Sequence, residues 1–305
     1  MESIKSMNKT VFTAVCGKTN AGKSSLVNLL VGEKVAIVSE KPQTTRTRIN
    51  GVLTKDNVQY VFVDTPGFHK EKSALSKHMH KSIRSSVAGV DVILLLADCT
   101  KKPFVERDLL DNGTDIILLL NKVDLVKDKT QLLTLIEQYS KLREFVEIIP
   151  ISVKNEINTE KILPVLDRYA NDGEFYYDSD LPTDQPEKVW LSEVIREKLL
   201  HELYEEIPHG IAVQIEGDER HQVVTKTNKG EDIIDMSAVI ICEKDSHKGM
   251  IIGKQGSMLK KIGEVARLEC EEYFGCKVNL KLWVKVSEDW RNRENLINEY
   301  GLKAE

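Results

Sequence analysis

The sequence lacks the features of secreted, disulfide-bonded and membrane proteins. Its five cysteines include no Cys-x-x-Cys pair, and an odd number without that spacing indicates reduced thiols in a cytosol-like compartment. The strongest apolar runs, VDVILLLADC and TDIILLLNKVDL, are short and interrupted by carboxylates, so we expect no membrane span. The N-terminal stretch MESIKSMNKT is charged and lacks the apolar core of a secretory signal. We therefore expect a cytoplasmic, folded protein.

Charge and length narrow the class of protein further. A net charge of −5 argues against a protein that coats nucleic acid over its whole surface, but it leaves room for one local basic face. At 305 residues the chain is long enough for two domains, because a domain usually has about 100–200 residues.

The hydrophobic pattern changes along the chain and indicates where the domains lie. After an N-terminal tail (1–9), residues 10–170 alternate β-rich apolar runs with helical stretches, which predicts an α/β domain with a mostly parallel sheet and helices on both faces. Residues 171–186 contain Gly, Pro, Asp and Ser that break every periodicity, and they form the predicted linker. Residues 187–305 follow the order α-β-β-α-α-β, which predicts a smaller α+β domain with a C-terminal tail.

A glycine-rich stretch at residues 17–24, GKTNAGKS, fits the pattern G-x-x-x-x-G-K-[ST] and lies between a predicted strand and a predicted helix. There the glycines let backbone N–H groups converge on phosphate oxygens, Lys23 can reach the β- and γ-phosphates, and the Ser24 hydroxyl can coordinate magnesium. A glycine turn with a surface lysine would not explain the strand–loop–helix placement. The predicted phosphate-binding residues are Gly17, Lys18, Thr19, Asn20, Ala21, Gly22, Lys23, Ser24 and Ser25.

A second motif, NKVD at residues 121–124, follows the apolar run DIILLL and indicates that the base is guanine. The Asp124 carboxylate can accept hydrogen bonds from the guanine N1–H and exocyclic amine, a pattern that adenine cannot offer. We expect Lys122 to pack its stem over the base and Asn121 to connect this loop to the phosphate-binding loop. A weaker motif, ISVK at residues 151–154, completes the predicted base site with Ser152, Val153 and Lys154.

Two motifs between these point to a magnesium ion and a nucleotide-dependent switch. In DTPG, Asp64 can hold a magnesium-bound water and the Gly67 N–H can meet the γ-phosphate. In QTTR, a threonine hydroxyl can complete the magnesium shell only when GTP is present; we favour Thr45, with Thr44 as the alternative. The DTPG motif contributes Asp64, Thr65, Pro66 and Gly67, and the predicted magnesium ligands are Ser24, Thr45 and Asp64.

The position directly after DTPG, where many small GTPases place a water-orienting glutamine, is Phe68. An apolar ring cannot orient water through a hydrogen bond, so intrinsic hydrolysis should be slow or use another group. Asn20 is similar to the asparagine of GTPases that bind a potassium ion beside the phosphates, and such a cation could do the work of an arginine finger. The alternative is that Asn20 only makes a hydrogen bond within its loop. The predicted catalytic groups are Lys23, Thr45, Gly67 and Asn20.

In the second domain, GKQG at residues 253–256 joins two predicted helices within a local excess of lysines. This arrangement resembles a type II KH domain, whose glycine loop lets a nucleic-acid backbone approach while an apolar groove receives unstacked bases. The alternatives are a tight turn and a solvated lysine face. Trp283 lies on the lysine side of KVNLKLWVKV, and we expect packing to cover it. The predicted RNA-binding residues are Lys248, Ile251, Ile252, Gly253, Lys254, Gln255, Gly256 and Lys260, with the isoleucines lining the groove.

Together these motifs resemble the Era family of bacterial GTPases over nearly the whole chain: GKTNAGKSSLVN, QTTR, DTPGFHK, NKVD, IREKLL, IGKQG and LWVKVSEDWRNRE. The resemblance implies a magnesium-dependent GTPase that binds the 3′ end of small-subunit ribosomal RNA and assists assembly of the small ribosomal subunit. It also implies that GTP promotes the RNA-binding arrangement and that some members associate peripherally with the inner face of the membrane. We expect a monomer. The alternative is an RNA chaperone in which GTP is mainly a structural or regulatory ligand with incidental turnover.

One segment departs from the family pattern. Residues 99–115, between two of the predicted strands, provide less chain than the family normally carries there. We therefore expect the intervening helix to be truncated or missing, while the sheet itself survives.

Overall fold

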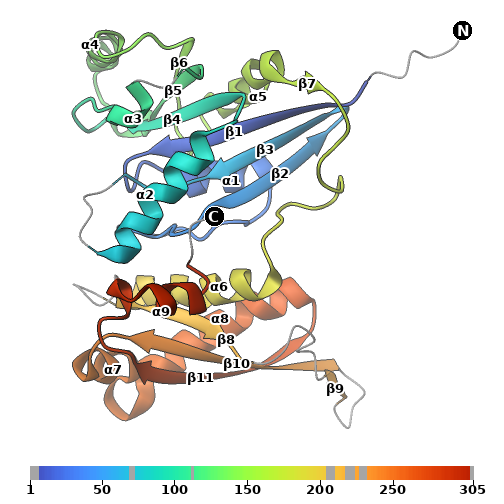
Figure 1. Ribbon diagram of the computed structural model, residues 1–305, viewed down its shortest axis with the longest axis vertical. Coiled ribbons are helices and arrows are strands. Elements are labelled where there is room, and N and C mark those ends of the chain that lie inside the picture. Colours follow the sequence, from blue (N-terminus) through green and yellow to red (C-terminus); the bar gives the residue numbers. More distant parts are fainter. Residues whose placement is uncertain are drawn as a thin grey trace, which may run out of the picture.

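The computed structural model describes residues 7–68, 73–110, 113–203, 210–216, 224–226 and 232–302 (Figure 1). Its N-terminal domain contains a sheet in the order β2-β3-β1-β4-β5-β6, in which neighbours are parallel except for the antiparallel pair β2 and β3. The short strand β7 pairs antiparallel with β1. The strands are β1 (Lys9–Gly17), β2 (Ile49–Lys55), β3 (Val58–Asp64), β4 (Val92–Asp98), β5 (Ile116–Asn121), β6 (Glu147–Pro150) and β7 (Asn171–Asp172).

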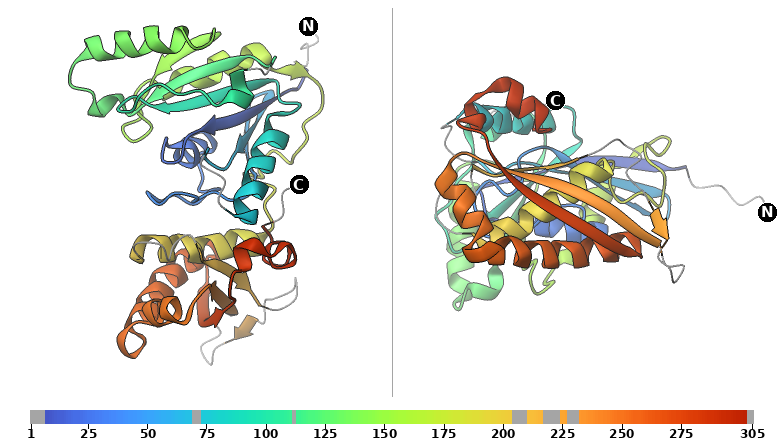
Figure 2. Two further views of the ribbon diagram at one scale, coloured as in Figure 1. Left: turned by 60° about the vertical axis from the view of Figure 1, so that its left-hand side comes forward. Right: turned by 90° about the horizontal axis from the view of Figure 1, so that it is seen from below.

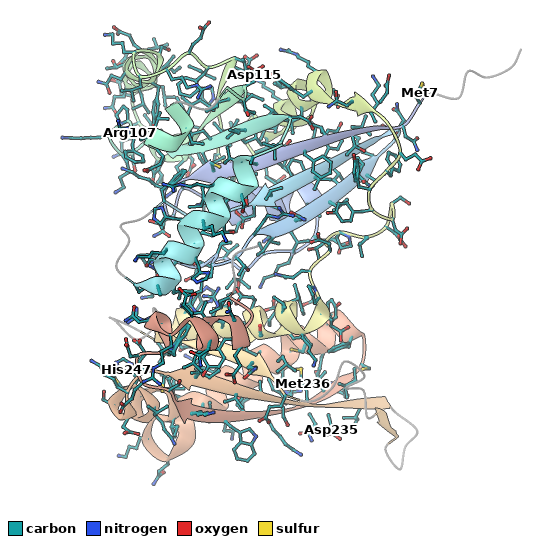
Figure 3. The ribbon with its side chains drawn as sticks, in the orientation of Figure 1. Met7, Arg107, Asp115, Asp235, Met236 and His247 are labelled. Atoms are coloured by element: carbon teal, nitrogen blue, oxygen red, sulfur yellow. The ribbon has the colours of Figure 1, made fainter. Side chains whose placement is uncertain are left out.

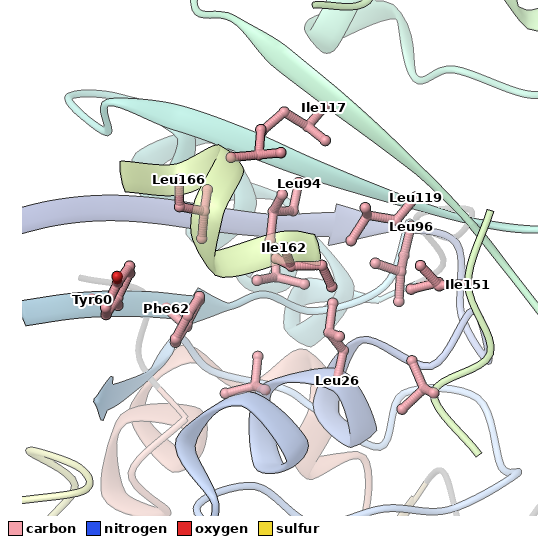
Figure 4. Packing of buried hydrophobic residues seen from close by; sticks show 14 of the residues in the cluster. Leu26, Tyr60, Phe62, Leu94, Leu96, Ile117, Leu119, Ile151, Ile162 and Leu166 are labelled. Atoms are coloured by element: carbon pink, nitrogen blue, oxygen red, sulfur yellow. The ribbon is translucent and has the colours of Figure 1, made fainter. Parts of the chain in front are cut away.

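Helices cover both faces of this sheet, as the strand–helix alternation predicts (Figure 1). One face packs apolar side chains against α1 and α5, with Leu26, Phe62 and Leu94 fully buried among them (Figure 4). The other face packs against α2, α3 and α4. The helices of this domain are α1 (Lys23–Val31), α2 (Ala74–Val87), α3 (Arg107–Leu110), α4 (Lys129–Ser140) and α5 (Ile162–Leu166), with 3₁₀ turns η1 (Val123–Leu125), η2 (Thr159–Lys161) and η3 (Asp167–Tyr169).

The C-terminal domain is a smaller α+β unit with its own apolar core. Its sheet has the order β11-β10-β8, with β10 parallel to β11 and antiparallel to β8, and β9 pairs with β10. Helix α6 contacts both α8 and β8, and α8 also contacts β11. The elements are α6 (Glu187–Glu202), β8 (Ala212–Ile215), β9 (Val224–Lys226), β10 (Asp232–Cys242), α7 (Asp245–Ile252), η5 (Lys254–Gly256), α8 (Ser257–Phe274), β11 (Lys277–Val286), η6 (Trp290–Asn292) and α9 (Glu294–Glu299).

Several boundaries differ from the sequence expectations. The linker begins with a strand, because Asn171 and Asp172 pair with β1, and the Pro182 carbonyl accepts a hydrogen bond from the Val52 N–H. In the described residues between β4 and β5, the helix is α3, which has four residues, as the reduced length of this segment predicts.

The two domains meet through a buried apolar cluster as well as through polar contacts. Leu75 and Met79 of α2 pack with Trp290, Ile297 and other apolar side chains of the C-terminal domain. Figure 2 shows α2 lying against the C-terminal helix α9. In the described part of the chain, no helix is both long enough and apolar enough to cross a membrane.

Candidate nucleotide and RNA sites

The phosphate-binding loop joins β1 to α1, and its backbone geometry explains the glycines. Gly17 has a φ of +146°, and a Cβ there would lie 2.3 Å from the carbonyl oxygen of Leu96. Gly22 has a φ of +100°, and a Cβ there would lie 2.5 Å from Asn121 Nδ2. Among the described residues, no side chain caps the first turn of α1. Its N–H groups therefore point at a space where the helix dipole favours an anion.

Lys23 lies inside this loop and is 7% exposed. Its Nζ donates to the carbonyl oxygens of Gly17 and Lys18, at 3.2 Å each. Burial lowers the pKa of Lys23, and the negative charge of Asp64 opposes that shift. A lysine that is held only by carbonyl oxygens can exchange them for phosphate oxygens, which bind it more strongly.

The predicted magnesium ligands meet at one point. Ser24 Oγ lies 2.7 Å from Asp64 Oδ2 and 2.9 Å from Thr45 Oγ1, and Thr45 Oγ1 lies 3.2 Å from the same carboxylate oxygen. Asp64 is fully buried, and its Oδ1 atom has no hydrogen-bond partner among the described residues. Burial raises the pKa of Asp64, while Lys23 and the two hydroxyls act in the opposite direction. Such an oxygen cluster with an unsatisfied carboxylate oxygen fits a hard divalent cation.

The structure also distinguishes the two threonines, Thr44 and Thr45, that could be the magnesium ligand. Thr44 Oγ1 donates to the carbonyl oxygen of Lys41 at 2.7 Å and lies away from the carboxylate cluster. Thr45 is 6% exposed and contacts both Ser24 and Asp64. The geometry therefore favours Thr45 over Thr44.

The DTPG segment packs directly on the phosphate-binding loop. A Cβ on Gly67 would lie 2.8 Å from the backbone nitrogen of Thr19, so a larger residue would displace the loop. The Phe68 N–H donates to the Gly17 carbonyl at 3.2 Å, and the Phe68 ring is buried in the apolar core. The residue after DTPG therefore has a packing role and cannot orient a water. His69, a further candidate for hydrolysis, lies outside the described residues.

The base site is connected to the phosphate-binding loop by Asn121. Its Nδ2 donates to the Ala21 carbonyl at 2.8 Å, and its Oδ1 accepts from the Val153 N–H at 3.0 Å. Asp124 is exposed, and one carboxylate oxygen accepts a 2.6 Å hydrogen bond from Ser152 Oγ. The other carboxylate edge can face a guanine, and the Ser152 hydroxyl fixes the orientation of the acid.

The sequence analysis did not predict Asp98 and Phe104, which contact two predicted residues of the nucleotide site. Lys122 Nζ lies 2.7 Å from Asp98 Oδ2, and Lys18 Nζ lies 3.9 Å from the centre of the Phe104 ring. Burial alone would raise the pKa of Asp98, but hydrogen bonds from Lys122 and Thr100 hold it below its usual value. Asp98 ends strand β4, beside Asn121 at the end of β5, and that position was the available signal.

Asn20 contacts residue 40, which lies in the segment 34–46 that contains the predicted switch motif QTTR. It has a φ of +62°, and its Nδ2 donates to the Glu40 carbonyl at 2.6 Å. Asn20 therefore makes a hydrogen bond from the phosphate-binding loop to residue 40. Its role as a cation ligand stays a prediction.

The nucleotide cavity continues onto the C-terminal domain. Its volume is about 2120 Å³, and the lining includes Glu197, Leu200 and His201 of α6 together with the phosphate-binding loop and NKVD. Ligand pockets usually enclose about 300–1,000 Å³. A nucleotide would therefore occupy one end of a cleft whose other wall is the C-terminal domain.

Residues 34–46 form a switch segment that lies along α6. Glu197, which is 3% exposed, accepts hydrogen bonds from Lys34 Nζ at 2.6 Å and from the Val38 N–H at 2.9 Å. Burial alone would raise the pKa of Glu197, but hydrogen bonds from Lys198 and Lys34 hold it below its usual value. His201 Nε2 lies 3.0 Å from the Val38 carbonyl oxygen.

The same segment is anchored beside Thr45. Arg196 of α6, 1% exposed, donates to the Thr44 carbonyl and pairs with Glu193. Arg46, 3% exposed, donates to the Ile211 carbonyl of the C-terminal domain. Burial, together with the positive charge of Arg196, lowers the pKa of Arg46 to about 9. Sequence reasoning missed Arg196 and Glu197, although both lie in the IREKLL stretch that supports the family resemblance.

The GKQG loop separates α7 from α8 in a strained turn. Gly253 has a φ of +74°, and a Cβ there would lie 2.7 Å from Met258 Cβ. Gln255 and Gly256 also have positive φ, at +51° and +80°. Lys254 and Gln255 are exposed. The loop therefore presents backbone and a lysine to solvent, as an approach of a phosphate backbone requires.

A groove of about 420 Å³ runs from this loop between α8 and the edge strand β11. Its lining consists of Gly256, Leu259, Lys260, Gly263, Glu264, Arg267, Leu280 and Leu282. Ile251 is fully buried in the domain core, so the expectation that it lines the groove is wrong. Ile252 and Lys248 are half-buried outside the groove lining, and Leu280 and Leu282 take the place expected for the isoleucines.

Comparisons with known proteins agree with the two predicted domains. Family models match residues 12–122 as a 50S ribosome-binding GTPase and residues 206–291 as a KH domain. GTPase Era of Clostridioides difficile is 45% identical over 97% of this chain and 99% of its own length. GTPase Era of Ruminiclostridium cellulolyticum is 44% identical over 97% of this chain and 98% of its own length.

Solved structures of Era match both domains together. A crystal structure of Era in complex with MgGDPNP and nucleotides 1506–1542 of 16S ribosomal RNA has a TM-score of 0.89 and 34% identity, covering 97% of this chain and 99% of that one. A crystal structure of a point variant of Aquifex aeolicus Era, bound to GDP·AlF4⁻, gives the same TM-score, identity and coverage. A TM-score of this size over both domains requires a similar relative placement of the domains.

Proposed function

The chain belongs to the Era family of GTPases, and from this premise we propose that it binds the 3′ end of small-subunit ribosomal RNA and assists assembly of the small ribosomal subunit under the control of GTP. The proposed place of action is the cytoplasm, with the peripheral membrane association that the family resemblance implies. The mixed sheet with its phosphate loop and the KH domain confirm the predicted fold.

The observation that carries the proposal is that three consecutive residues connect the two sites. Thr45 contacts the predicted magnesium ligands Ser24 and Asp64, while its neighbours Thr44 and Arg46 contact the KH domain. A segment that orders around the γ-phosphate side of the nucleotide must therefore also order against α6. The conformation that binds GTP would then also be the conformation that places the KH domain.

Within the GTPase site, the residues divide the work as follows. Ser24, Thr45 and Asp64 would hold the magnesium ion, which supplies positive charge to the β- and γ-phosphate oxygens. Lys23 and the N–H groups at the start of α1 bind the phosphates, and the Gly67 N–H meets the γ-phosphate. The N–H groups belong to the backbone of the loop and of α1, so they can stabilise the developing charge with little reorganisation.

Potassium stimulation is part of the proposal. A hydrogen bond from Asn20 Nδ2 to the Glu40 carbonyl joins the phosphate-binding loop to the switch segment, and both residues line the cleft. A monovalent cation bound by the Asn20 side-chain oxygen would add positive charge beside the phosphates, as an arginine finger does. Such a cation would also hold the switch segment closed, since Glu40 belongs to residues 34–46.

The test compares RNA affinity in two nucleotide states. We expect the protein to bind the 3′-terminal ribosomal RNA several-fold more tightly with the non-hydrolysable GDPNP than with GDP, measured by fluorescence anisotropy. Lys254→Asp should weaken RNA binding in both states, because it places a negative charge beside the RNA backbone, while GTP affinity stays at the wild-type value. Equal RNA affinity in the two states would favour the alternative of an RNA chaperone with structural GTP.

A further inference from the structure

The outer face of strand β11 carries an exposed tryptophan that neither site uses. Along β11, the side chains of Lys277, Asn279, Lys281, Trp283 and Lys285 are exposed, while those between them are buried or half-buried. Trp283 is 58% exposed, so the expectation that packing covers it is wrong. We call Lys281, Trp283 and Lys285 the outer β11 face.

Packing of the fold does not account for Trp283. Its partner in the sheet, Val239 of β10, packs against the apolar cluster between the two domains, which does not include Trp283. The helices α6 and α8 cover the opposite face of the sheet, where Met236 lies. In Figure 3, Asp235 and Met236, neighbours on β10, mark the two faces. Trp283 is therefore an exposed aromatic side chain that is available to bind a partner.

The charge around Trp283 is suited to an anionic partner. Lys281 and Lys285 are two residues before and after it, which places each about 7 Å away along the strand on the same face. Neither lysine forms an ion pair with any residue that the structure describes. The acid that lies on this face of β10, Asp235, accepts a 2.6 Å hydrogen bond from Asn279. An aromatic ring between free lysines on a sheet is a typical platform for single-stranded nucleic acid.

The outer β11 face is continuous with the KH groove. Leu280 and Leu282 line the groove from the same strand, and β11 is the edge of its sheet. A strand of RNA that leaves the groove across this edge reaches Trp283 directly. The RNA in the solved Era complex spans nucleotides 1506–1542, whereas a KH groove clamps about four nucleotides.

We propose that the outer β11 face is a second contact surface for single-stranded RNA, on which one base stacks on Trp283 and the adjacent phosphates bind Lys281 and Lys285. This inference rests on the proposed function, because it extends the RNA path that begins in the groove. Strand β11 then contributes to both RNA surfaces. Leu280 and Leu282 line the groove, and Lys281, Trp283 and Lys285 form the outer β11 face.

The test uses two RNAs and the full-length protein with GDPNP. One RNA is the 3′-terminal segment equivalent to nucleotides 1506–1542, and the other has about five nucleotides, enough to fill the groove alone. Trp283→Leu should weaken binding of the long RNA about tenfold, because stacking on one aromatic ring is lost. It should leave the short RNA unaffected. Trp283→Phe should restore most of the affinity, because it retains an aromatic ring.

Charge and fluorescence provide independent readouts. The double variant Lys281→Ala/Lys285→Ala should reduce the salt dependence of long-RNA binding, while Lys55→Ala, at an exposed strand position of the GTPase domain, should not. Long RNA should quench tryptophan fluorescence in the wild type, and Trp283→Phe should remove that quenching. Wild-type affinity of Trp283→Leu for the long RNA, or an equal loss for both RNAs, would overturn the inference. Failure of the wild type to bind either RNA would instead contradict the proposed function.

Discussion

At the scale of single residues, the proposed function makes guanine selection depend on one exposed carboxylate. Asp124 is oriented by a 2.6 Å hydrogen bond from Ser152, and Asn121 connects this part of the site to the phosphate-binding loop through Ala21. Because Asn121 makes the structural connection, the identity of residue 124 can change without loss of the loop. Base choice and loop integrity are therefore carried by different side chains.

We expect Asp124→Asn to lower GTP affinity by about 10- to 100-fold, because the amide cannot accept both hydrogen bonds and leaves a polar group of the base unpaired, at a cost of about 1–3 kcal/mol. Affinity for xanthosine triphosphate should rise, since its second carbonyl can accept from the new amide. Titration calorimetry with both nucleotides measures the exchange. Unchanged guanine selectivity would remove Asp124 from this role, and an unchanged melting temperature would show that the loop is intact.

At the scale of secondary-structure elements, the switch segment and α6 form the contact between the domains. Glu197 binds Lys34 and the Val38 N–H, Arg196 binds the Thr44 carbonyl, and Arg46 extends into the KH domain. The side chains of Glu197, Arg196 and Arg46 are buried, so loss of their partners would incur a large desolvation cost. The segment is thus held firmly only when both of its partners are in place.

Arg46→Ala should uncouple the two sites. Loss of its hydrogen bond to the Ile211 carbonyl removes a buried charge-assisted contact of about 1.5–3 kcal/mol, so the several-fold ratio of RNA affinities between the GDPNP and GDP states should fall to nearly one. GDP affinity should stay near the wild-type value, because Arg46 does not line the nucleotide cavity. Arg48→Ala, at an exposed position two residues on, is the matched control. A full nucleotide effect in Arg46→Ala would show that coupling uses another route.

The sites that the sequence predicts well are those built from contiguous residues. GKTNAGKS lies on one strand–loop–helix unit, so its spacing alone determines its geometry. The KH groove is different, because its walls come from α8 and β11, which are separate in the chain. Alternation along β11 predicts which residues share a face, but not which face the helices cover, and this explains the error at Trp283. Ile251 was misplaced because a helix terminus can turn its last apolar residues inward.

At the scale of the whole molecule, GTP and RNA must affect each other's binding equally. If GTP raises RNA affinity by a given factor, RNA raises GTP affinity by the same factor, and such couplings are typically about 1–3 kcal/mol. The structure gives this coupling a physical path from Thr45 through Arg46 and Arg196 to the KH domain. In the proposed cycle, hydrolysis resets the molecule, because loss of the γ-phosphate would remove the partner that orders residues 34–46.

The central claim, that one coupled switch joins nucleotide and RNA, is tested most directly by the rate of GTP turnover. The purified protein is assayed in potassium and in sodium buffer, each with and without the 3′-terminal ribosomal RNA or an assembling small subunit. The account predicts that potassium and RNA each raise turnover, and that Asn20→Ala removes the potassium effect while GTP still binds. Negligible turnover under every condition, in a protein that binds both GTP and RNA, would contradict it.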